Sequence, residues 1–160
     1  MDYFQGVVYD YLQQRGMFIK AECPIQVEPG KFPPKGTSWI CDAIAVNFKR
    51  RTIYLCEVSY AKTLYALARR LQAWSKEWPR LCDAIVRDYS IPDSDSWRVQ
   101  PWVFVPVGLR KQLKRRLSET VKVSSHAGKV PMPAPKVTFL ESVVPWRGKT
   151  RERNGRRDGA

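Results

Sequence analysis

Two carboxylates stand at matching places in the stretch from Trp39 to Tyr60, which reads WICDAIAVNFKRRTIYLCEVSY. Asp42 lies near the outer end of one apolar run, and Glu57 lies near the outer end of the next. A hairpin that turns symmetrically about Lys49 and Arg50 places Asp42 directly opposite Glu57. Both side chains then point to the same side of the sheet, because side chains alternate along a strand with period two. The pattern therefore predicts a facing pair of acids at the end of an apolar ladder.

Such a pair needs a cation, because two like charges that face each other destabilise a hairpin. A divalent metal ion meets this need. Mg²⁺ prefers one or two carboxylates and keeps several water ligands, which leaves room for a phosphate oxygen. The ion can polarise a phosphodiester and activate a water molecule. The alternative is that both acids lie at the rim of the sheet and meet an ordinary Lys or Arg.

The charge of the whole chain favours a phosphate-bearing partner. The chain has 28 Lys and Arg against 15 Asp and Glu, a formal net charge of +13. A fold does not require this imbalance, and polyanions are its usual reason, with nucleic acid first and anionic membranes second. The alternative is a basic but inert surface. We expect DNA as the partner, with RNA as the second choice.

Other chemistries have little support in the sequence. The chain has a single histidine, His126, and four cysteines without a CxxC pair. These counts argue against a hydrolase triad and against a zinc site, and the cysteines are expected to be buried free thiols. No apolar run approaches the length of a membrane span, and the N-terminus lacks a signal-peptide layout. We expect a cytoplasmic protein without a membrane partner.

Hydrophobic periodicity predicts the elements that position the two acids. We expect an α/β fold over residues 1–145, with a central mixed β-sheet flanked by helices, and a basic, disordered tail over 146–160. The seam of the long helix contains Pro79, which predicts either a kink or two helices that meet near Trp78. The expected elements are a helix (3–15), strands (17–27, 39–47 and 52–60), a long helical seam (63–89), a strand (97–108), a short helix (109–119) and a last strand (136–144), with a loop at 28–38.

This layout resembles the PD-(D/E)XK nuclease superfamily, which includes restriction endonucleases and archaeal-type Holliday junction resolvases. The resemblance covers residues 3–107 and implies a restriction endonuclease-like core. By the resemblance, Asp42 matches the first metal-binding acid, and CEVSY (56–60) matches the strand that carries the second, Glu57. Many relatives carry a metal-binding Glu on the first helix; Gln5 takes roughly that place, with Asp10 and Glu22 as further candidates.

One departure from the family concerns its lysine, two residues after the Glu, which is Ser59 here. Ser59 still points to the face of Glu57 but supplies no positive charge. Since such lysines sometimes move to a neighbouring element, Lys62 is the nearest candidate. A polar face of the predicted long helix combines Lys62 with Arg69, Gln72 and Lys76. Its two interpretations are an ordinary solvated face and a strip that approaches the active centre and the DNA backbone.

A second basic segment lies on the short helix at 109–119. Acids are nearly absent from it, so its basic side chains are expected to contact phosphates. They are Arg110, Lys111, Lys114, Arg115 and Arg116.

The expected function is a metal-dependent DNA endonuclease in which Asp42 and Glu57 hold Mg²⁺ or Mn²⁺ and Lys62 orients or activates the water. A homodimer is expected from the resemblance alone. Losing one charge-stabilising group costs on the order of 10²–10³ in rate, so the absent lysine weakens the enzyme hypothesis without removing it. The alternatives are a nuclease-fold protein that binds DNA or RNA without efficient cleavage, and an RNA-associated protein without chemistry.

Overall fold

A computed structural model describes residues 2–27, 39–124 and 130–144 of the chain. The loop predicted at 28–38, His126 and the tail predicted at 146–160 lie outside the described residues. The helices and strands are α1 (Tyr3–Gln14), β1 (Phe18–Pro24), β2 (Ile40–Asn47), β3 (Thr52–Val58), α2 (Tyr65–Lys76), α3 (Trp78–Asp88), β4 (Arg98–Val105), α4 (Arg110–Ser124), β5 (Lys136–Phe139) and α5 (Leu140–Val143).

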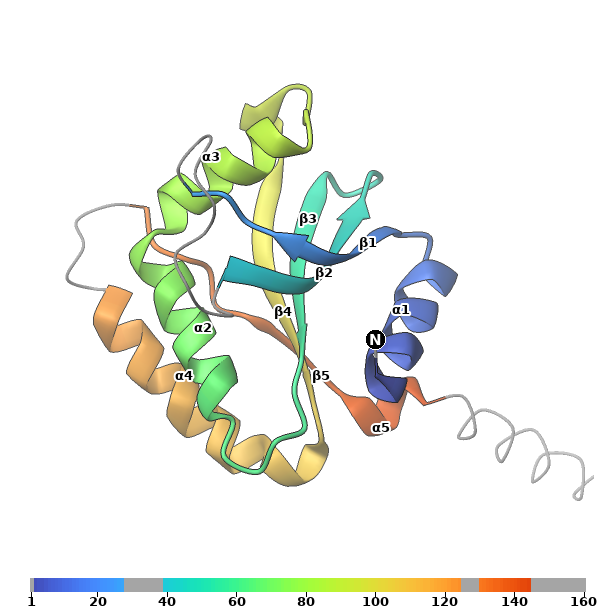
Figure 1. The fold of residues 1–160 in the computed structure, drawn as a ribbon, viewed down its shortest axis with the longest axis vertical. Coiled ribbons are helices and arrows are strands. Elements are labelled where there is room, and N and C mark those ends of the chain that lie inside the picture. Colours follow the sequence, from blue (N-terminus) through green and yellow to red (C-terminus); the bar gives the residue numbers. More distant parts are fainter. Residues whose placement is uncertain (1, 28–38, 125–129, 145–160) are drawn as a thin grey trace, which may run out of the picture.

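A mixed five-stranded sheet forms the centre of the molecule, in the order β1-β2-β3-β4-β5. The pairs β1–β2 and β2–β3 are antiparallel, whereas β3–β4 and β4–β5 are parallel. Helices α2, α3 and α4 lie on one side of the sheet, and α1 and α5 lie on the other (Figure 1). The α/β class with a mixed sheet between helices is therefore confirmed.

The two faces of the sheet build two separate cores, because side chains alternate along β2 and β3. Ile44 and Leu55 pack on the face covered by α2 and α3, together with Trp74. Ala45 and Cys56 pack on the opposite face with α1 and α5. Strand β4 is buried on both faces from residue 101 to 105, as is typical of a strand between two parallel or mixed neighbours.

The hairpin register predicted from the sequence is confirmed. Ala43 pairs with Cys56, and Asn47 pairs with Thr52, across a turn over residues 48–51. The Asn47 side chain stabilises this turn by accepting a hydrogen bond from the Arg50 backbone amide at 3.0 Å. Continued by one residue, this register places the two acids at the same end of β2 and β3.

The helical seam forms two helices that meet near Trp78, which is one of the two predicted arrangements: α2 ends at Lys76 and α3 begins at Trp78. Pro79 lies in the first turn of α3, where its missing amide proton is not needed. The order of elements differs from the prediction at the last strand. The last predicted strand ends at Phe139, and its second half forms α5. The reason is burial: Leu140 and Val143, one helical turn apart, both enter the α1-side core.

Two further expectations are tested by the described residues. Three cysteines are buried free thiols as expected, whereas Cys82 is only half-buried. No helix in the described ranges is long and apolar enough to cross a membrane.

Candidate active site

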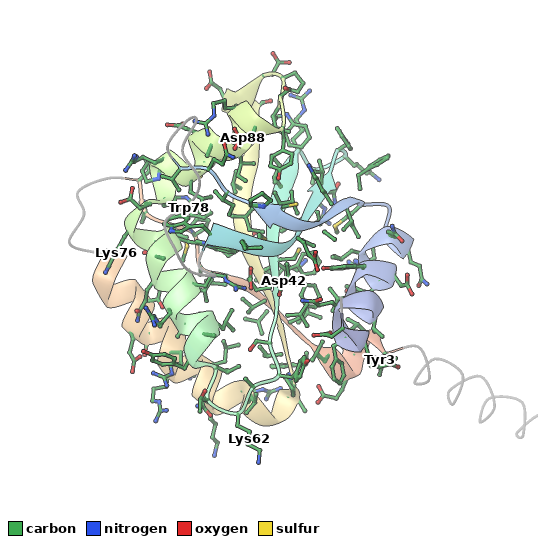
Figure 2. The ribbon with its side chains drawn as sticks, in the orientation of Figure 1. Tyr3, Asp42, Lys62, Lys76, Trp78 and Asp88 are labelled. Carbon is green, nitrogen blue, oxygen red and sulfur yellow. The ribbon has the colours of Figure 1, made fainter. Side chains whose placement is uncertain are left out.

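Asp42 and Glu57 meet where β2 and β3 pass beyond their last paired residues. The Asp42 backbone amide donates a hydrogen bond to Glu57 Oε1 at 3.3 Å, and the Val58 amide donates to Asp42 Oδ2 at 2.8 Å. Asp42 thus takes the place of a backbone acceptor at the end of the ladder. Figure 2 shows Asp42 near the middle of the molecule, between the helices of the two sheet faces. The structure therefore brings the two predicted acids into one site.

Helix α1 holds Asp42 from the other side. Asp2 caps this helix: its carboxylate accepts from the Gln5 amide at 2.8 Å, and the Gln5 side chain accepts from the Asp2 amide at 3.1 Å. The Gln5 side-chain nitrogen is then directed to Asp42 Oδ1, at 3.2 Å. The Tyr9 hydroxyl donates to the Asp42 backbone carbonyl at 2.7 Å. Gln5, expected here by resemblance, is therefore in contact with Asp42 of the acid pair.

Among the described residues the cation that meets the acids is Arg70, which the sequence pattern did not predict as part of the site. Its guanidinium forms an ion pair with Glu57 Oε2. The Glu57 side chain is only 2% exposed and that of Arg70 16% exposed, so the pair is largely shielded from water. A signal for it existed in the sequence: Arg70 lies three residues after Leu67 and four before Trp74, both buried on α2. A charge on a buried seam requires a buried partner.

Burial dominates the electrostatics of the two acids. Burial and the neighbouring Asp42 raise the pKa of Glu57 to about 8, although the Arg70 guanidinium acts in the opposite direction. Burial also raises the pKa of Asp42, while its hydrogen bond from Val58 and the charge of Arg70 lower it. Within the described residues, Arg70 therefore does not fully compensate the buried Glu57 and the half-buried Asp42, and the pair attracts a proton or a second cation near neutral pH.

The raised pKa of Glu57 predicts that the free energy of unfolding falls with rising pH. Between the ordinary glutamate pKa of 4.5 and about 8, the folded state retains a proton on Glu57 that the unfolded chain has released. The free energy of unfolding therefore decreases through this window and does not depend on this group above it. Because Glu57→Gln removes the titrating group, the wild type should lose stability relative to this variant between about pH 5 and about pH 8. Urea unfolding of both proteins in chelator measures the difference; a constant difference would contradict the assignment.

The structure does not bring Lys62 to the acids. It is exposed in the turn before α2, and Figure 2 places it well apart from Asp42. Helix α2 begins only at Tyr65, because Leu64 adopts a left-handed conformation with φ 50° while its side chain is buried. Ser59 is half-buried, and its amide donates to the Phe104 carbonyl at 3.0 Å.

The remaining candidates lie on outer faces. Arg69 and Lys76 are exposed on α2, and Gln72 is half-buried between them. The polar face of α2 therefore has the position of an ordinary solvated surface. Asp10 and Glu22 are exposed on α1 and β1.

Basic side chains gather on α4, as the sequence predicted. Helix α4 buries Leu113 against the core and packs on α2. Of the five α4 side chains that were expected to contact phosphates, four are exposed, while Arg116 is half-buried and its guanidinium lies 3.7 Å from the Glu119 carboxylate. The Gln112 side chain donates to the Thr63 carbonyl at 2.8 Å, which ties α4 to the turn that carries Lys62. Among the α4 side chains whose burial the structure describes, the exposed basic residues are Arg110, Lys111, Lys114 and Arg115.

The donor set at the pair fits a hard divalent cation. Each carboxylate oxygen of Asp42 and Glu57 accepts one hydrogen bond and keeps a further lone pair for a ligand. Carboxylates that ligate metal ions are commonly hydrogen-bonded in this way. In the described part of the chain, no cluster of three His, Cys, Asp or Glu side chains could hold a metal. An ion here would therefore have two protein carboxylates and water, which suits Mg²⁺ or Mn²⁺.

No protein-family model matches the sequence, and no curated protein matches it significantly. Function is therefore inferred from the acid pair, its arginine and the charge of the surface. A buried and a half-buried carboxylate, paired among the described residues with Arg70 alone, favour the binding of another cation. An excess of exposed basic side chains favours a polyanion.

Proposed function

We propose that the protein is a metal-dependent nuclease that hydrolyses phosphodiester bonds in DNA, with Asp42 and Glu57 as the ligands of Mg²⁺ or Mn²⁺. The observation that carries the proposal is the contact of these two acids on adjoining strands, where Arg70 is the one ion-pair partner that the described residues supply. The net charge of +13 supports a nucleic acid as the substrate. A restriction endonuclease-like core is part of the proposal, since the sheet has the mixed order that this resemblance implies.

The residues around the pair have distinct roles in this proposal. Gln5 and the Val58 amide orient the Asp42 carboxylate. Arg70 neutralises part of the charge on Glu57, but an arginine stays protonated and does not act as a base. A bound metal ion would polarise the phosphodiester and lower the pKa of a bound water. Lys62 contributes to the basic surface instead of activating water, because it lies apart from the acids.

A cleavage assay tests the proposal directly. Labelled duplex, branched and single-stranded DNA are incubated with the protein in Mg²⁺, in Mn²⁺ and in chelator. We expect strand cleavage with either metal and none in chelator. Absence of cutting under all three conditions would contradict the nuclease.

The second candidate is a nuclease-fold protein that binds DNA or RNA without efficient cleavage. It is favoured by two observations: Arg70 already compensates part of the charge on Glu57, and Ser59 supplies no charge where the family has a lysine. Salt-sensitive binding without metal-dependent cutting would support this candidate.

The α4 surface predicts the salt dependence of binding. Each phosphate contact that is lost reduces the slope of log affinity against log salt by about 0.9 on duplex DNA. Replacing Lys111 and Arg115 by Ala should therefore lower the slope by up to about 1.8. The matched control replaces Lys49 and Arg50 by Ala. Both are exposed in the β2–β3 turn, at the end of these two strands that lies away from Asp42 and Glu57. Fluorescence anisotropy titrations at several salt concentrations measure the slope; equal effects of the two double variants would contradict a specific role for α4.

A further inference from the structure

Exposed aromatic and basic side chains alternate along the connection from β3 to α2 and the first turns of α2. In chain order they are Tyr60, Lys62, Tyr65 and Arg69, and all four are exposed. The tyrosines are 47% and 56% exposed. Single exposed aromatic residues are common on protein surfaces, but two that alternate with cations on one segment form a surface suited to a charged aromatic ligand.

One end of this segment is fixed next to the acid pair. Tyr60 follows Glu57 by three residues, and its hydroxyl donates to Asp2 Oδ2 at 3.0 Å. Its ring lies 5.0 Å from that of Phe4, on the first turn of α1. Since Asp2 also caps the helix whose Gln5 contacts Asp42, the Tyr60 ring is positioned by the same contacts as the site.

The rest of the segment, from Lys62 to Arg69, lies beside the basic helix α4. The turn at Lys62 and Thr63 is held by the hydrogen bond from Gln112 of α4, at 2.8 Å. The Arg69 guanidinium lies 5.7 Å from the centre of the Tyr65 ring. Figure 1 shows this connection running from the end of β3 past the beginning of α4 before α2 starts. A ligand that follows the segment therefore passes from the acid pair to the positive charge of α4.

We propose that this segment binds a single strand of DNA, with unpaired bases stacked on Tyr60 and Tyr65 and phosphates held by Lys62, Arg69 and α4. Alternating aromatic and basic contacts are how proteins follow a single strand without reading its sequence. A duplex cannot use the two rings, because its base faces are covered by their neighbours in the stack. The inference rests on the proposed function and deepens it: the substrate is single-stranded DNA or a single-stranded end.

Binding measured in chelator tests the inference without cleavage. The probes are a labelled single strand of about 15 nucleotides and the duplex of the same sequence. We expect Tyr60→Leu and Tyr65→Leu each to weaken single-strand binding about 5- to 100-fold, with little change for the duplex. The salt slope should be unchanged, since a tyrosine releases no counterions.

Two further variants separate stacking from structural effects. Tyr60→Phe loses the bond to Asp2 but keeps the ring and its packing on Phe4, so it should retain most of the single-strand affinity that Tyr60→Leu loses. Phe18→Leu removes a ring that is 68% exposed on the edge strand β1, and it should bind both probes normally. The inference would be overturned by any of three results: Phe18→Leu weakens single-strand binding as much as the tyrosine variants do, the tyrosine variants weaken duplex binding by the same factor, or neither tyrosine variant weakens single-strand binding. Tighter binding of single-stranded RNA than of DNA would overturn the assignment to DNA.

The same measurements distinguish a failure of the single-strand surface from a failure of the nuclease proposal. Ring-dependent binding without metal-dependent cutting would support the single-strand surface and contradict the nuclease. Metal-dependent cutting by both tyrosine variants, with single-strand affinity equal to that of the wild type, would support the nuclease and contradict the single-strand surface.

Discussion

Asp42→Asn is expected to lower metal-dependent cleavage by about 10²- to 10³-fold, because it removes one of the two carboxylates proposed to hold the metal. The substitution keeps the shape of the side chain but leaves one oxygen for two donors, the Gln5 side chain and the Val58 amide. We therefore also expect a loss of stability of about 1–3 kcal/mol from the donor left without an acceptor. Single-turnover cleavage rates at saturating DNA measure the first effect, and urea unfolding measures the second.

The matched control is Asp10→Asn, which removes an exposed acid from α1. This variant should cleave and unfold like the wild type, since surface substitutions of this kind change stability by less than about 0.5 kcal/mol. DNA binding in chelator should be retained in both variants, because neither removes a basic side chain. Cleavage by Asp42→Asn at the rate of the wild type would place the chemistry elsewhere.

Arg70→Met is expected to lower the free energy of unfolding by about 3–5 kcal/mol at a pH above about 8, where Glu57 is charged. The reason is that the variant leaves a carboxylate that is 2% exposed without its ion-pair partner. The loss should shrink at lower pH, because Glu57 can then take up a proton, and the pKa of Glu57 should rise further. Urea unfolding of both proteins at about pH 5.5 and about pH 8.5 measures this dependence.

The neighbouring Arg69→Met serves as the control, since Arg69 is exposed on the same helix. It should change the free energy of unfolding by less than about 0.5 kcal/mol. The double variant Arg70→Met with Glu57→Gln should regain much of the loss, because no buried charge is left without compensation. If Arg70→Met is no less stable than Arg69→Met, the ion pair does not stabilise the fold.

Metal binding adds a second measurement on the same variants. A ligand that binds only the folded state raises the unfolding free energy with its concentration. If Asp42 and Glu57 hold Mg²⁺, the ion should restore stability to Arg70→Met, which has an uncompensated pair of acids. It should not stabilise the double variant, which lacks the Glu57 carboxylate. Equal stabilisation of both would show that Mg²⁺ binds at another place.

The hairpin and its facing acids could be predicted from the sequence because they depend on local geometry. Side chains alternate along a strand, and an even-numbered turn keeps the register, so the positions of Asp42 and Glu57 follow from their numbers. The amphipathic character of α1 and the burial of the run through Trp102 follow from periodicity in the same way. The basic surface of α4 follows from the charges between Leu109 and Leu117.

Only the tertiary structure decided which cation meets the acids and where the last strand ends. The placement of α2 on the sheet brings Arg70 to Glu57 and leaves Lys62 outside, and no spacing along the chain specifies that placement. Residues 140–143 form a helix instead of a strand because burying Leu140 and Val143 beside α1 outweighs their local preference. Periodicity is set by the backbone of one element, whereas a buried ion pair depends on how two elements pack.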